Sequence, residues 1–425
     1  MKNRKSLIAI TVFVPFWVIM FIFIPANIHP AEDATILYSY SENLADTGQI
    51  VYNINGEKTE GATDFLWMIL ISIMYKAGIS SYASALFLNF IGLFISYFLL
   101  INILNIKDSI ILQILLGLTF ILSNQIFASI QGFSANFFLM FIILAFFFYK
   151  KSNHLFFVIS FTFLCLIRPD GILVAIPSIV MDLILNNEKR KNKLIIILVT
   201  FLIPGLIYFI WRYNYFGMLL PLPIYVKSDV DKLFFINPST VKYLFQYLIF
   251  HLIILLSALI YSIVILKEKM DKDIILIATS MIIIPILAYS AMSLTQNIGD
   301  RFMITVYFGF IILVFNMLRN NTKVLLFFLL FFLSFQLPNF LNNFTKTLDI
   351  ANEQMVDFSF DLGKLPKGKL ALSEAGRLQY YSKWETIDLL GLNNKEIAKS
   401  VVDSLMLSRI NPDLVVLHSG NDRYE

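Results

Sequence analysis

Long apolar runs follow one another along most of this chain and are separated by short polar or charged stretches. Most runs approach the roughly 20 residues that a helix needs to cross the hydrocarbon core of a bilayer. The pattern therefore predicts a polytopic α-helical membrane protein with about eleven to twelve transmembrane segments. The predicted segments are residues 6–27, 65–78, 82–104, 110–128, 133–149, 154–167, 172–186, 194–212, 241–266, 274–293, 302–318 and 323–338.

Two stretches depart from this pattern. Residues 29–64 are rich in polar side chains and follow the first apolar run directly, and hydropathy falls again from about Leu337 to the end of the chain. We therefore expect a transmembrane domain over residues 1–338, with a long loop at 29–64, and a soluble α/β domain over residues 339–425. These two stretches are called the first loop and the tail below.

Within the tail, KLALSEA (369–375) and DLVVLHS (413–419) are short apolar stretches between turn-forming residues, and they predict strands. KEIAKSVVDSLMLSRI (395–410) has the spacing of an amphipathic helix. The tail is therefore predicted to be a small α/β unit.

Lysine and arginine residues between the apolar runs indicate the side of each loop, because they are enriched in cytoplasmic loops. The first loop carries seven acidic residues and one lysine, which places it outside the membrane. A last cytoplasmic loop at Arg319 and Lys323 places the tail outside as well, so we expect a multi-pass protein of the inner (plasma) membrane with both on the extracytoplasmic face. The predicted cytoplasmic clusters are Lys2, Arg4 and Lys5, then Lys150 and Lys151, then EKRKNK at 188–193 and KEKMDKD at 267–273.

Counting every apolar run as one membrane crossing conflicts with the cytoplasmic side assigned to Lys150 and Lys151. If every apolar run before Lys150 crossed the membrane, Lys150 and Lys151 would lie outside. The run at 65–78 would be only about 21 Å long at 1.5 Å per residue, against roughly 30 Å of hydrocarbon. We therefore expect this run to be re-entrant or only partly inserted.

The composition excludes several classes of protein. With 42 Phe, only 15% charged residues and a mean hydropathy of +0.75, the chain is not an ordinary soluble domain. The net charge of +4 is scattered without a basic, aromatic-interleaved patch, which argues against nucleic acid as a partner. Cys165 is the single cysteine and cannot form an intramolecular disulfide. Residues 1–27 start like a signal peptide, but their long apolar core without a cleavage pattern predicts a retained anchor.

Two adjacent carboxylates, Glu32 and Asp33, open the first loop. Their structural interpretation is that acids in the first turn of a helix complement its macrodipole, and that Asp is a favoured N-cap. Ile36, Tyr40 and Leu44, at i, i+4 and i+8, would then form an apolar stripe lying along the membrane surface.

The functional interpretation comes from the rest of the loop. GQIVYNINGEKTEGATDFLW at 48–67 brings Glu57, Glu60 and Asp64 back towards the same surface through glycine and Asn-Gly turns. Helix capping requires fewer acids than this. The pattern therefore favours a water-filled acidic vestibule at the edge of the bilayer.

The order of these motifs resembles the first external loop of membrane-integral GT-C glycosyltransferases, especially the arabinofuranosyltransferase-like and protein-mannosyltransferase-like bacterial branches. The resemblance lies in two adjacent acids, a short amphipathic helix containing ENLA, and then VYN, NGE, EGAT and FLW. It continues in order through QGFSANFF at 131–138, IRPDG at 167–171, GDRF at 299–302, and SEAGRLQYYSKWETIDLLGLNNKEIA and NPDLVVLHS in the tail. The first loop and the tail are specific signals, whereas RPDG and GDRF are weak alone.

The resemblance implies a GT-C-like fold and a transferase that moves a sugar from a polyprenyl-phosphate donor to a glycan, lipid or protein acceptor outside the membrane. It also implies that Glu32 or Asp33 supplies the catalytic base. This chemistry fits the residue types, because displacement at the anomeric carbon needs a carboxylate to take the acceptor's hydroxyl proton. It also needs cations or donors that stabilise the departing lipid phosphate.

Arg168, Arg212 and Arg301 are candidates for binding that phosphate, because arginine binds phosphate through two N–H groups and each stands at the end of an apolar run. The alternative for each is snorkelling at the interface or a structural ion pair, such as Arg301 with Asp300. The full set of substrate-binding candidates is Glu57, Glu60, Arg168, Asp170, Asp300 and Arg301.

Three positions depart from the family pattern. Glu32 stands where aspartate is usual, Ser39 where an arginine often follows the acids, and Ser134 where related sequences carry glutamate. These differences leave the donor sugar and the identity of the base open. The four histidines are scattered singly, so no metal-binding spacing is visible and no cofactor is required, while a divalent cation among the loop carboxylates stays open.

The tail has two possible roles. It packs over the first loop as a lid, or it binds the acceptor, with Gly376, Tyr380, Tyr381 and Trp384 placed to stack a sugar ring. Aromatic residues at such spacing are also typical of a core.

Two other functions compete with glycosyl transfer. A transporter or flippase of lipid-linked glycans would also use an acidic vestibule and intramembrane arginines, and a non-catalytic scaffold of an envelope assembly complex is a third class. No inverted repeat is evident, and a transporter has no need of a long acidic first loop. The sequence therefore favours the transferase.

Overall fold

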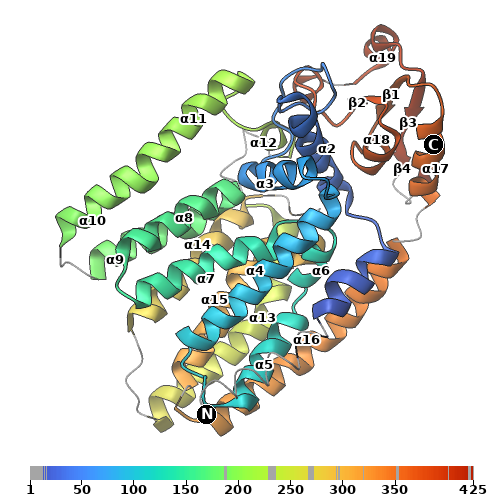
Figure 1. Ribbon diagram of the computed structural model, residues 1–425. Coiled ribbons are helices and arrows are strands. Elements are labelled where there is room, and N and C mark those ends of the chain that lie inside the picture. Colours follow the sequence, from blue (N-terminus) through green and yellow to red (C-terminus); the bar gives the residue numbers. More distant parts are fainter. Residues whose placement is uncertain are drawn as a thin grey trace.

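The computed structural model describes residues 13, 15, 17–185, 189–227, 236–266, 272–292, 294, 297–318, 320–350, 354–400, 402–419 and 423–424. Most of these residues belong to a bundle of helices, and the first loop and the tail form a layer at one end of it (Figure 1). Residues 1–12, 14 and 16, which include nine positions of the predicted first segment, lie outside the described residues. The described part of this segment contains η1 (Ile19–Phe23) and η2 (Pro25–Asn27).

The predicted apolar runs coincide closely with the helices of the bundle. Five helical stretches, residues 81–103, 190–216, 238–264, 298–318 and 322–348, are long and apolar enough to cross a membrane. The predicted class, a mostly helical membrane protein with a small C-terminal α/β region, is thereby confirmed. The bundle helices are α4 (Ser81–Ile103), α5 (Ile110–Ile121), α7 (Ala135–Lys150), α8 (His154–Ile167), α9 (Ile172–Leu185), α10 (Arg190–Ile197), η4 (Leu198–Leu202), α11 (Ile203–Phe216), α13 (Pro238–Tyr261), η6 (Ser262–Leu266), α14 (Lys272–Ser290), α15 (Ile304–Leu318) and α16 (Thr322–Ile350).

Short elements connect the bundle helices or belong to the first loop. They include α2 in the first loop and α3 directly after it. Their bounds are α2 (Glu32–Thr47), α3 (Phe65–Lys76), α6 (Gln125–Ile130), η3 (Pro169–Gly171), α12 (Leu222–Lys227) and η7 (Ile298–Met303).

Contacts between helix termini define two ends of the bundle. Asp182 contacts His154 and Lys193, at 2.9 Å each, and this joins the start of α8, the end of α9 and the start of α10. At the opposite end, Arg212 of α11 pairs with Glu60 of the first loop. The basic clusters at 150–151 and 189–193 therefore lie at the end remote from the first loop, as a common cytoplasmic side requires.

The helix α3 does not cross the bundle. Asp64, just before it, accepts a hydrogen bond from Ser134 at the start of α7 (2.9 Å), and Ser81, which begins α4, bonds Glu42 of α2 (2.8 Å). Both ends of α3 therefore lie at the loop end, where Figure 1 shows it beside α2. The expectation that this short run does not span is confirmed, and the conflict over the side of Lys150 disappears.

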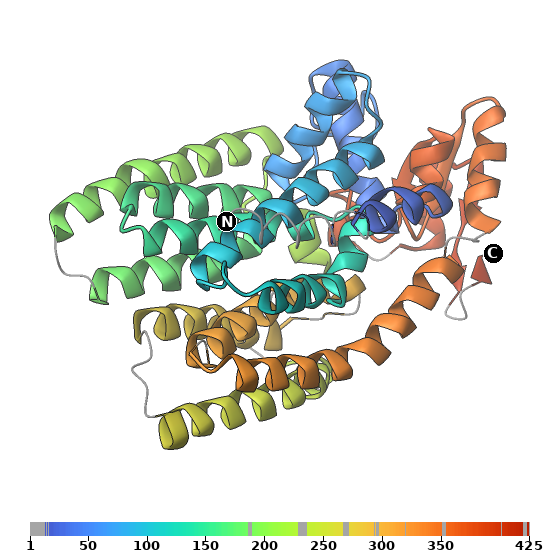
Figure 2. The same ribbon diagram turned by 60° about the horizontal axis from the view of Figure 1, so that its bottom comes forward.

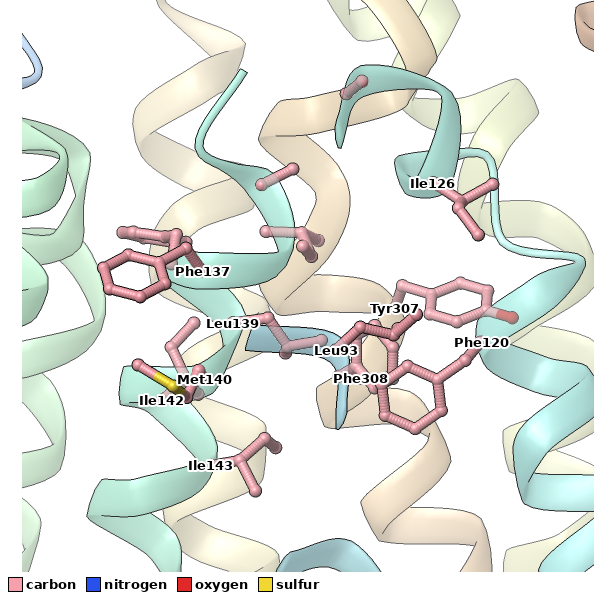
Figure 3. Packing of buried hydrophobic residues seen from close by; sticks show 14 of the residues in the cluster. Leu93, Phe120, Ile126, Phe137, Leu139, Met140, Ile142, Ile143, Tyr307 and Phe308 are labelled. Atoms are coloured by element: carbon pink, nitrogen blue, oxygen red, sulfur yellow. The ribbon is translucent and has the colours of Figure 1, made fainter. Parts of the chain in front are cut away.

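Aromatic and aliphatic side chains from α4, α5, α7 and α15 fill the centre of the bundle (Figure 3). The rings of Phe120 and Phe308 lie 4.7 Å apart, and the Tyr307 hydroxyl donates to the Thr119 carbonyl (2.6 Å). A Cβ at Gly92 of α4 would lie 2.6 Å from a backbone oxygen of α7, so the glycine permits this close approach. In the same core, every residue of α15 is buried.

The helices α10 and α11 lie at the edge of the molecule and expose apolar side chains along most of their length (Figure 1). The rest of the protein buries only 6% of the most apolar stretch of these helices. A helix that is apolar all round without protein neighbours requires lipid as its solvent. The exposed faces therefore support the assignment of this segment to the membrane.

The long helix α16 continues beyond the predicted boundary at residue 338 and leads directly to the tail (Figure 2). The tail contains a three-stranded parallel sheet of order β2-β1-β3 and a short antiparallel pair. Its elements are α17 (Gln354–Lys364), β1 (Lys369–Leu372), α18 (Arg377–Ser382), β2 (Glu385–Asp388), η8 (Ile397–Lys399), α19 (Ser404–Ile410), β3 (Leu414–Val416), β4 (His418–Ser419) and β5 (Arg423–Tyr424).

Two of the tail predictions are confirmed and one is wrong. The stretches at 369–375 and 413–419 contain β1 and β3, as predicted. The single helix predicted at 395–410 is instead the 3₁₀ turn η8 followed by α19. Asp403 causes the new start, because its carboxylate accepts a hydrogen bond from the Met406 amide (2.8 Å) and caps α19.

The helix α2 does not lie on a membrane surface. Residues 34–42 are buried on all sides, because α3 and α4 cover one face and α18 of the tail covers another. Tyr38 donates to the Gly132 carbonyl (3.2 Å), while Ser39 on the other side donates to Gln379 (2.5 Å). The predicted surface stripe is wrong because the tail supplies a second protein surface.

The contacts between the first loop and the tail generate a prediction about topology. Single cysteines at the exposed positions Thr47 and Ser408, in a Cys165→Ser background, should both react with an impermeant thiol reagent applied to intact cells. A cysteine at Lys151, also exposed but at the opposite end, is the control and should react only after permeabilisation. Labelling of only one of the first two, or of Lys151 in intact cells, would contradict the shared external face.

Candidate active site

Four segments that are distant in the sequence meet at the loop end of the bundle. They are the start of α2, the residues before α3, the turn η3 between α8 and α9, and η7 before α15. Together they gather the side chains that we call the charged cluster: Asp33, Asp64, Arg168, Asp170 and Arg301.

The centre of the charged cluster is an ion pair between Asp33 and Arg301. Arg301 Nη2 lies 3.1 Å from Asp33 Oδ2, and the side chains are only 18% and 10% exposed for Asp33 and Arg301 respectively. The Arg301 guanidinium also lies over the ring of Phe133, 3.8 Å from its centre. Since a guanidinium keeps its charge in a protein, it is buried only with such partners. The pair joins two residues, predicted in different roles, that are 268 positions apart.

The backbone before Arg301 has an unusual conformation. Gly299 and Asp300 have φ values of +58° and +50°, and a Cβ at position 299 would lie 2.7 Å from the Ala128 nitrogen. The Asp300 carboxylate accepts hydrogen bonds from Tyr243 and Asn124, both at 2.6 Å. Asp300 therefore anchors the turn that presents Arg301, and the ion pair between Arg301 and Asp300 considered from the sequence is wrong.

Arg168 and Asp170 form a second ion pair, which is bidentate. Arg168 Nε donates to Asp170 Oδ1 (2.9 Å) and Nη2 donates to Oδ2 (2.6 Å), while the Tyr289 hydroxyl donates to the same Oδ2 (2.7 Å). Arg168 Nη1 also points to the backbone oxygen of Arg301, at 3.5 Å. The two arginines are therefore neighbours.

Asp64 is the member of the cluster that was not predicted, since the sequence marked it only as one of the loop acids. Its Oδ2 accepts a hydrogen bond from Ser134 (2.9 Å) and its Oδ1 accepts one from Thr63 (3.3 Å). Burial raises the pKa of Asp64, and the positive charges of Arg168 and Arg301 offset part of this shift. Its place directly before an apolar run was the available signal, because such a residue lies at the end of the bundle.

Three other candidates have ion-pair partners outside the charged cluster. Arg212 and Glu60 bind each other through Nε and Oε1 (2.8 Å) and through Nη2 and Oε2 (2.5 Å), and both side chains are 5% exposed. Glu57 is 56% exposed and contacts Lys395 of the tail (3.1 Å). These residues tie the first loop to α11 and to the tail.

Glu32 faces the tail, although its neighbour Asp33 faces Arg301. Glu32 Oε1 accepts hydrogen bonds from the backbone amides of Gly376 and Arg377, both at 2.8 Å. A Cβ at position 376 would lie 2.3 Å from the Glu32 backbone oxygen, so only glycine fits there. Burial raises the pKa of Glu32 to about 8, against the opposing effects of Arg377 and the two amides. The two adjacent carboxylates therefore have different partners, because successive residues of a helix point about 100° apart.

The tail residues considered for sugar stacking have partners within the protein. The Tyr380 hydroxyl donates to Glu42 (2.7 Å), Tyr381 contacts His29 (3.2 Å), and Trp384 donates to the Leu362 carbonyl (3.1 Å). Gly376 lies against Glu32. These contacts favour the packing role of the tail over a free stacking surface.

Within the described ranges, no group of three or more His, Cys, Asp or Glu side chains is placed to hold a metal ion. The carboxylates of the charged cluster contact guanidinium and hydroxyl groups instead. The divalent cation that the sequence left open therefore has no preformed ligand set in this part of the chain.

The fold as a whole is similar to the crystal structure of ArnT from Cupriavidus metallidurans in the apo state. The TM-score is 0.51, and the similarity covers 97% of this chain and 93% of that chain at 10% sequence identity. At this identity the likeness shows the fold alone. Residues 349–425 match the domain of unknown function DUF8728, and this match begins where α16 ends. No match was found among curated proteins.

The contact between Glu32 and the tail amides predicts a contrast between two substitutions. Glu32→Ala leaves the amides of Gly376 and Arg377 without their acceptor and should destabilise the protein by about 1–3 kcal/mol. Glu32→Gln keeps an acceptor oxygen and should be close to wild type in thermal unfolding near pH 4.5, where Glu32 itself is largely protonated. Equal stability of the Ala and Gln variants would contradict the contact.

The same residue predicts a pH dependence. The pKa of Glu32 is raised from 4.5 to about 8 in the folded protein, so ionisation opposes folding. The contribution of Glu32 to stability should be fully present below about pH 4.5 and lost as the pH rises towards 8. Thermal unfolding of wild type and Glu32→Gln between pH 5 and 8.5 measures this, and the stability difference should shift in favour of the variant as pH rises. Parallel curves would disprove the shift.

Proposed function

We propose that this chain is a membrane-integral glycosyltransferase that moves a sugar from a polyprenyl-phosphate donor to a glycan, lipid or protein acceptor. The observation that carries the proposal is the charged cluster, in which a carboxylate and two arginines meet at the end of a membrane bundle. The resemblance of the first-loop motifs to GT-C glycosyltransferases and the ArnT-like fold support the same class of protein. The charge asymmetry of the loops favours a site on the extracytoplasmic face.

Asp33 is the carboxylate best placed to act as the general base. It lies in the charged cluster beside Arg301, whereas Glu32 is held by two backbone amides of the tail. A base must come within hydrogen-bond reach of the acceptor hydroxyl, and a carboxylate that positions the tail is poorly suited to that role. We therefore assign proton transfer to Asp33 and positioning of the tail to Glu32.

Arg301 has capacity for a further anionic partner. Its Nη1 is buried and has no hydrogen-bond partner among the residues that the structure describes. A phosphate oxygen would satisfy this N–H group, and Arg168 is close enough to contribute a second cation. When a donor phosphate shares Arg301, the attraction of the guanidinium for Asp33 weakens and Asp33 becomes a stronger base. Donor binding would thus prepare the base for the acceptor.

The proposed reaction is a direct displacement. The acceptor oxygen attacks the anomeric carbon, the bond from that carbon to the phosphate oxygen breaks, and the polyprenyl phosphate leaves with the electron pair. Asp33 takes the hydroxyl proton of the acceptor, and the charge that develops on the phosphate is stabilised by Arg301 and Arg168. Every atom of the donor is found in the glycosylated acceptor or in the released lipid phosphate.

Transfer of labelled sugar from a polyprenyl-phosphate donor, using purified protein, tests this assignment. Asp33→Asn cannot take the proton, and its rate should fall by about 10² to 10⁴. Glu32→Gln, the matched control, should keep measurable transfer. If both variants transfer at the wild-type rate, Asp33 is not the base; if wild type instead moves intact lipid across liposomes without a covalent product, the protein is a flippase.

Changing Arg301 to Lys keeps the positive charge but loses the planar pair of N–H donors. If Arg301 contacts the phosphate through two N–H groups, this change should weaken the binding free energy of the lipid-phosphate donor by about 1–3 kcal/mol. Arg212→Lys is the control, because Arg212 pairs with Glu60 outside the charged cluster. Donor kinetics that are unchanged in Arg301→Lys, or equally weakened in the control, would reject this role.

A further inference from the structure

Among the residues that the structure describes, three carboxyl groups share the charged cluster with two guanidinium groups, so these charges do not balance. Arg168 is paired with Asp170 and Arg301 with Asp33. In the described part of the chain, no cation lies within ion-pair distance of Asp64. The groups that bond Asp64 are the neutral hydroxyls of Ser134 and Thr63.

A buried excess of negative charge is unfavourable, and the phosphate of a lipid-linked donor would add to it. A single proton on one of the three carboxyl groups removes the excess. Asp33 and Asp170 each contact a guanidinium directly, so each has a positively charged ion-pair partner. Asp64 lacks such a contact, so protonating its carboxyl group costs less free energy than protonating either of the other two. Burial also favours the protonated form, because it raises the pKa of Asp64.

The surroundings of Asp64 are consistent with a neutral carboxylic acid. A carboxylic acid accepts hydrogen bonds at one oxygen and donates through the other. Ser134 donates to Oδ2 at 2.9 Å, whereas the contact of Oδ1 with Thr63 is long, at 3.3 Å, which leaves Oδ1 available to carry the proton. Asp64 interacts electrostatically with four charged or titratable groups. They come from η3 and the residue before it, from η7 and from α11: Arg168, Asp170, Arg301 and Tyr208.

We propose that Asp64 carries a proton in the substrate-free site and donates a hydrogen bond to the donor phosphate, as a catalytic residue beside Arg301 and Arg168. This inference rests on the proposed function, because the phosphate is the ligand that Asp64 would contact. The donated bond strengthens as the bond to the anomeric carbon breaks and negative charge accumulates on the phosphate. The proton stays shared between Asp64 and the phosphate, and the proton of the acceptor goes to Asp33.

Binding of a short-chain prenyl phosphate to the detergent-purified protein at pH 7 tests the hydrogen bond. Asp64→Ala should weaken binding about tenfold or more, since hydrogen bonds to charged groups contribute about 1.5–3 kcal/mol. Asp64→Asn should rescue binding to within about twofold of wild type, because its amide N–H can donate in place of the acid. Asp46→Ala, at an exposed acid of α2, is the matched control and should bind as wild type.

Two binding results would overturn the inference. An ionised Asp64 would repel the phosphate, so Asp64→Asn would then bind about tenfold more tightly than wild type. Alternatively, Asp64→Ala would bind as wild type if Asp64 did not touch the ligand.

An infrared difference spectrum tests the proton without any substrate. The spectrum of wild type minus Asp64→Asn at pH 7 should contain the C=O stretch of a protonated carboxyl group, and its absence would overturn the proton assignment. If the band is present but wild type neither binds prenyl phosphate nor transfers sugar, the proposed function and the phosphate contact both fail, while the proton on Asp64 stands. If wild type binds and transfers but lacks the band, only the inference about Asp64 fails.

Discussion

The ion pair between Asp33 and Arg301 is the contact on which the arrangement of the site depends. A guanidinium that is 90% buried needs a carboxylate partner, because leaving it unpaired in a low-dielectric interior costs several kcal/mol. The partner comes from the first turn of α2, so α2 must lie with its start against η7. A Cβ at Gly132 would lie 2.0 Å from the Tyr38 hydroxyl oxygen, which shows how closely the rest of α2 then approaches the bundle.

The tail covers the side of α2 that the bundle leaves open, and polar contacts fix it there. Asn53 of the first loop both donates to and accepts from the backbone of Thr386 (2.8 and 3.0 Å), in the manner of an added strand residue. Lys383 pairs with Glu42 of α2 (2.7 Å). These contacts join the tail to the same helix that carries Asp33, so the position of the tail and that of α2 depend on each other.

Both arginines of the charged cluster are paired with carboxylates of the protein, Arg168 with Asp170 and Arg301 with Asp33. In the proposed function, a donor phosphate would share Arg301 with Asp33, so its binding and the basicity of Asp33 would be coupled through one guanidinium. Asp300 takes no part in this exchange, because Tyr243 and Asn124 hold it in the turn before Arg301. The turn therefore fixes the position of the Arg301 guanidinium.

The sequence by itself determined the membrane class, nearly every helix of the bundle, two strands of the tail and the failure of residues 65–78 to cross. These features depend on local hydropathy and on charges at segment ends, which can be read over windows of about twenty residues. Only the tertiary structure decided which charges meet: Arg301 with Asp33 and not with Asp300, Arg212 with Glu60, and Glu32 with amides of the tail. It also placed Asp64 beside Ser134 and buried α2 beneath the tail. The physical reason is that these contacts depend on distances between residues that are 70 or more positions apart in the chain, and no local pattern encodes those distances.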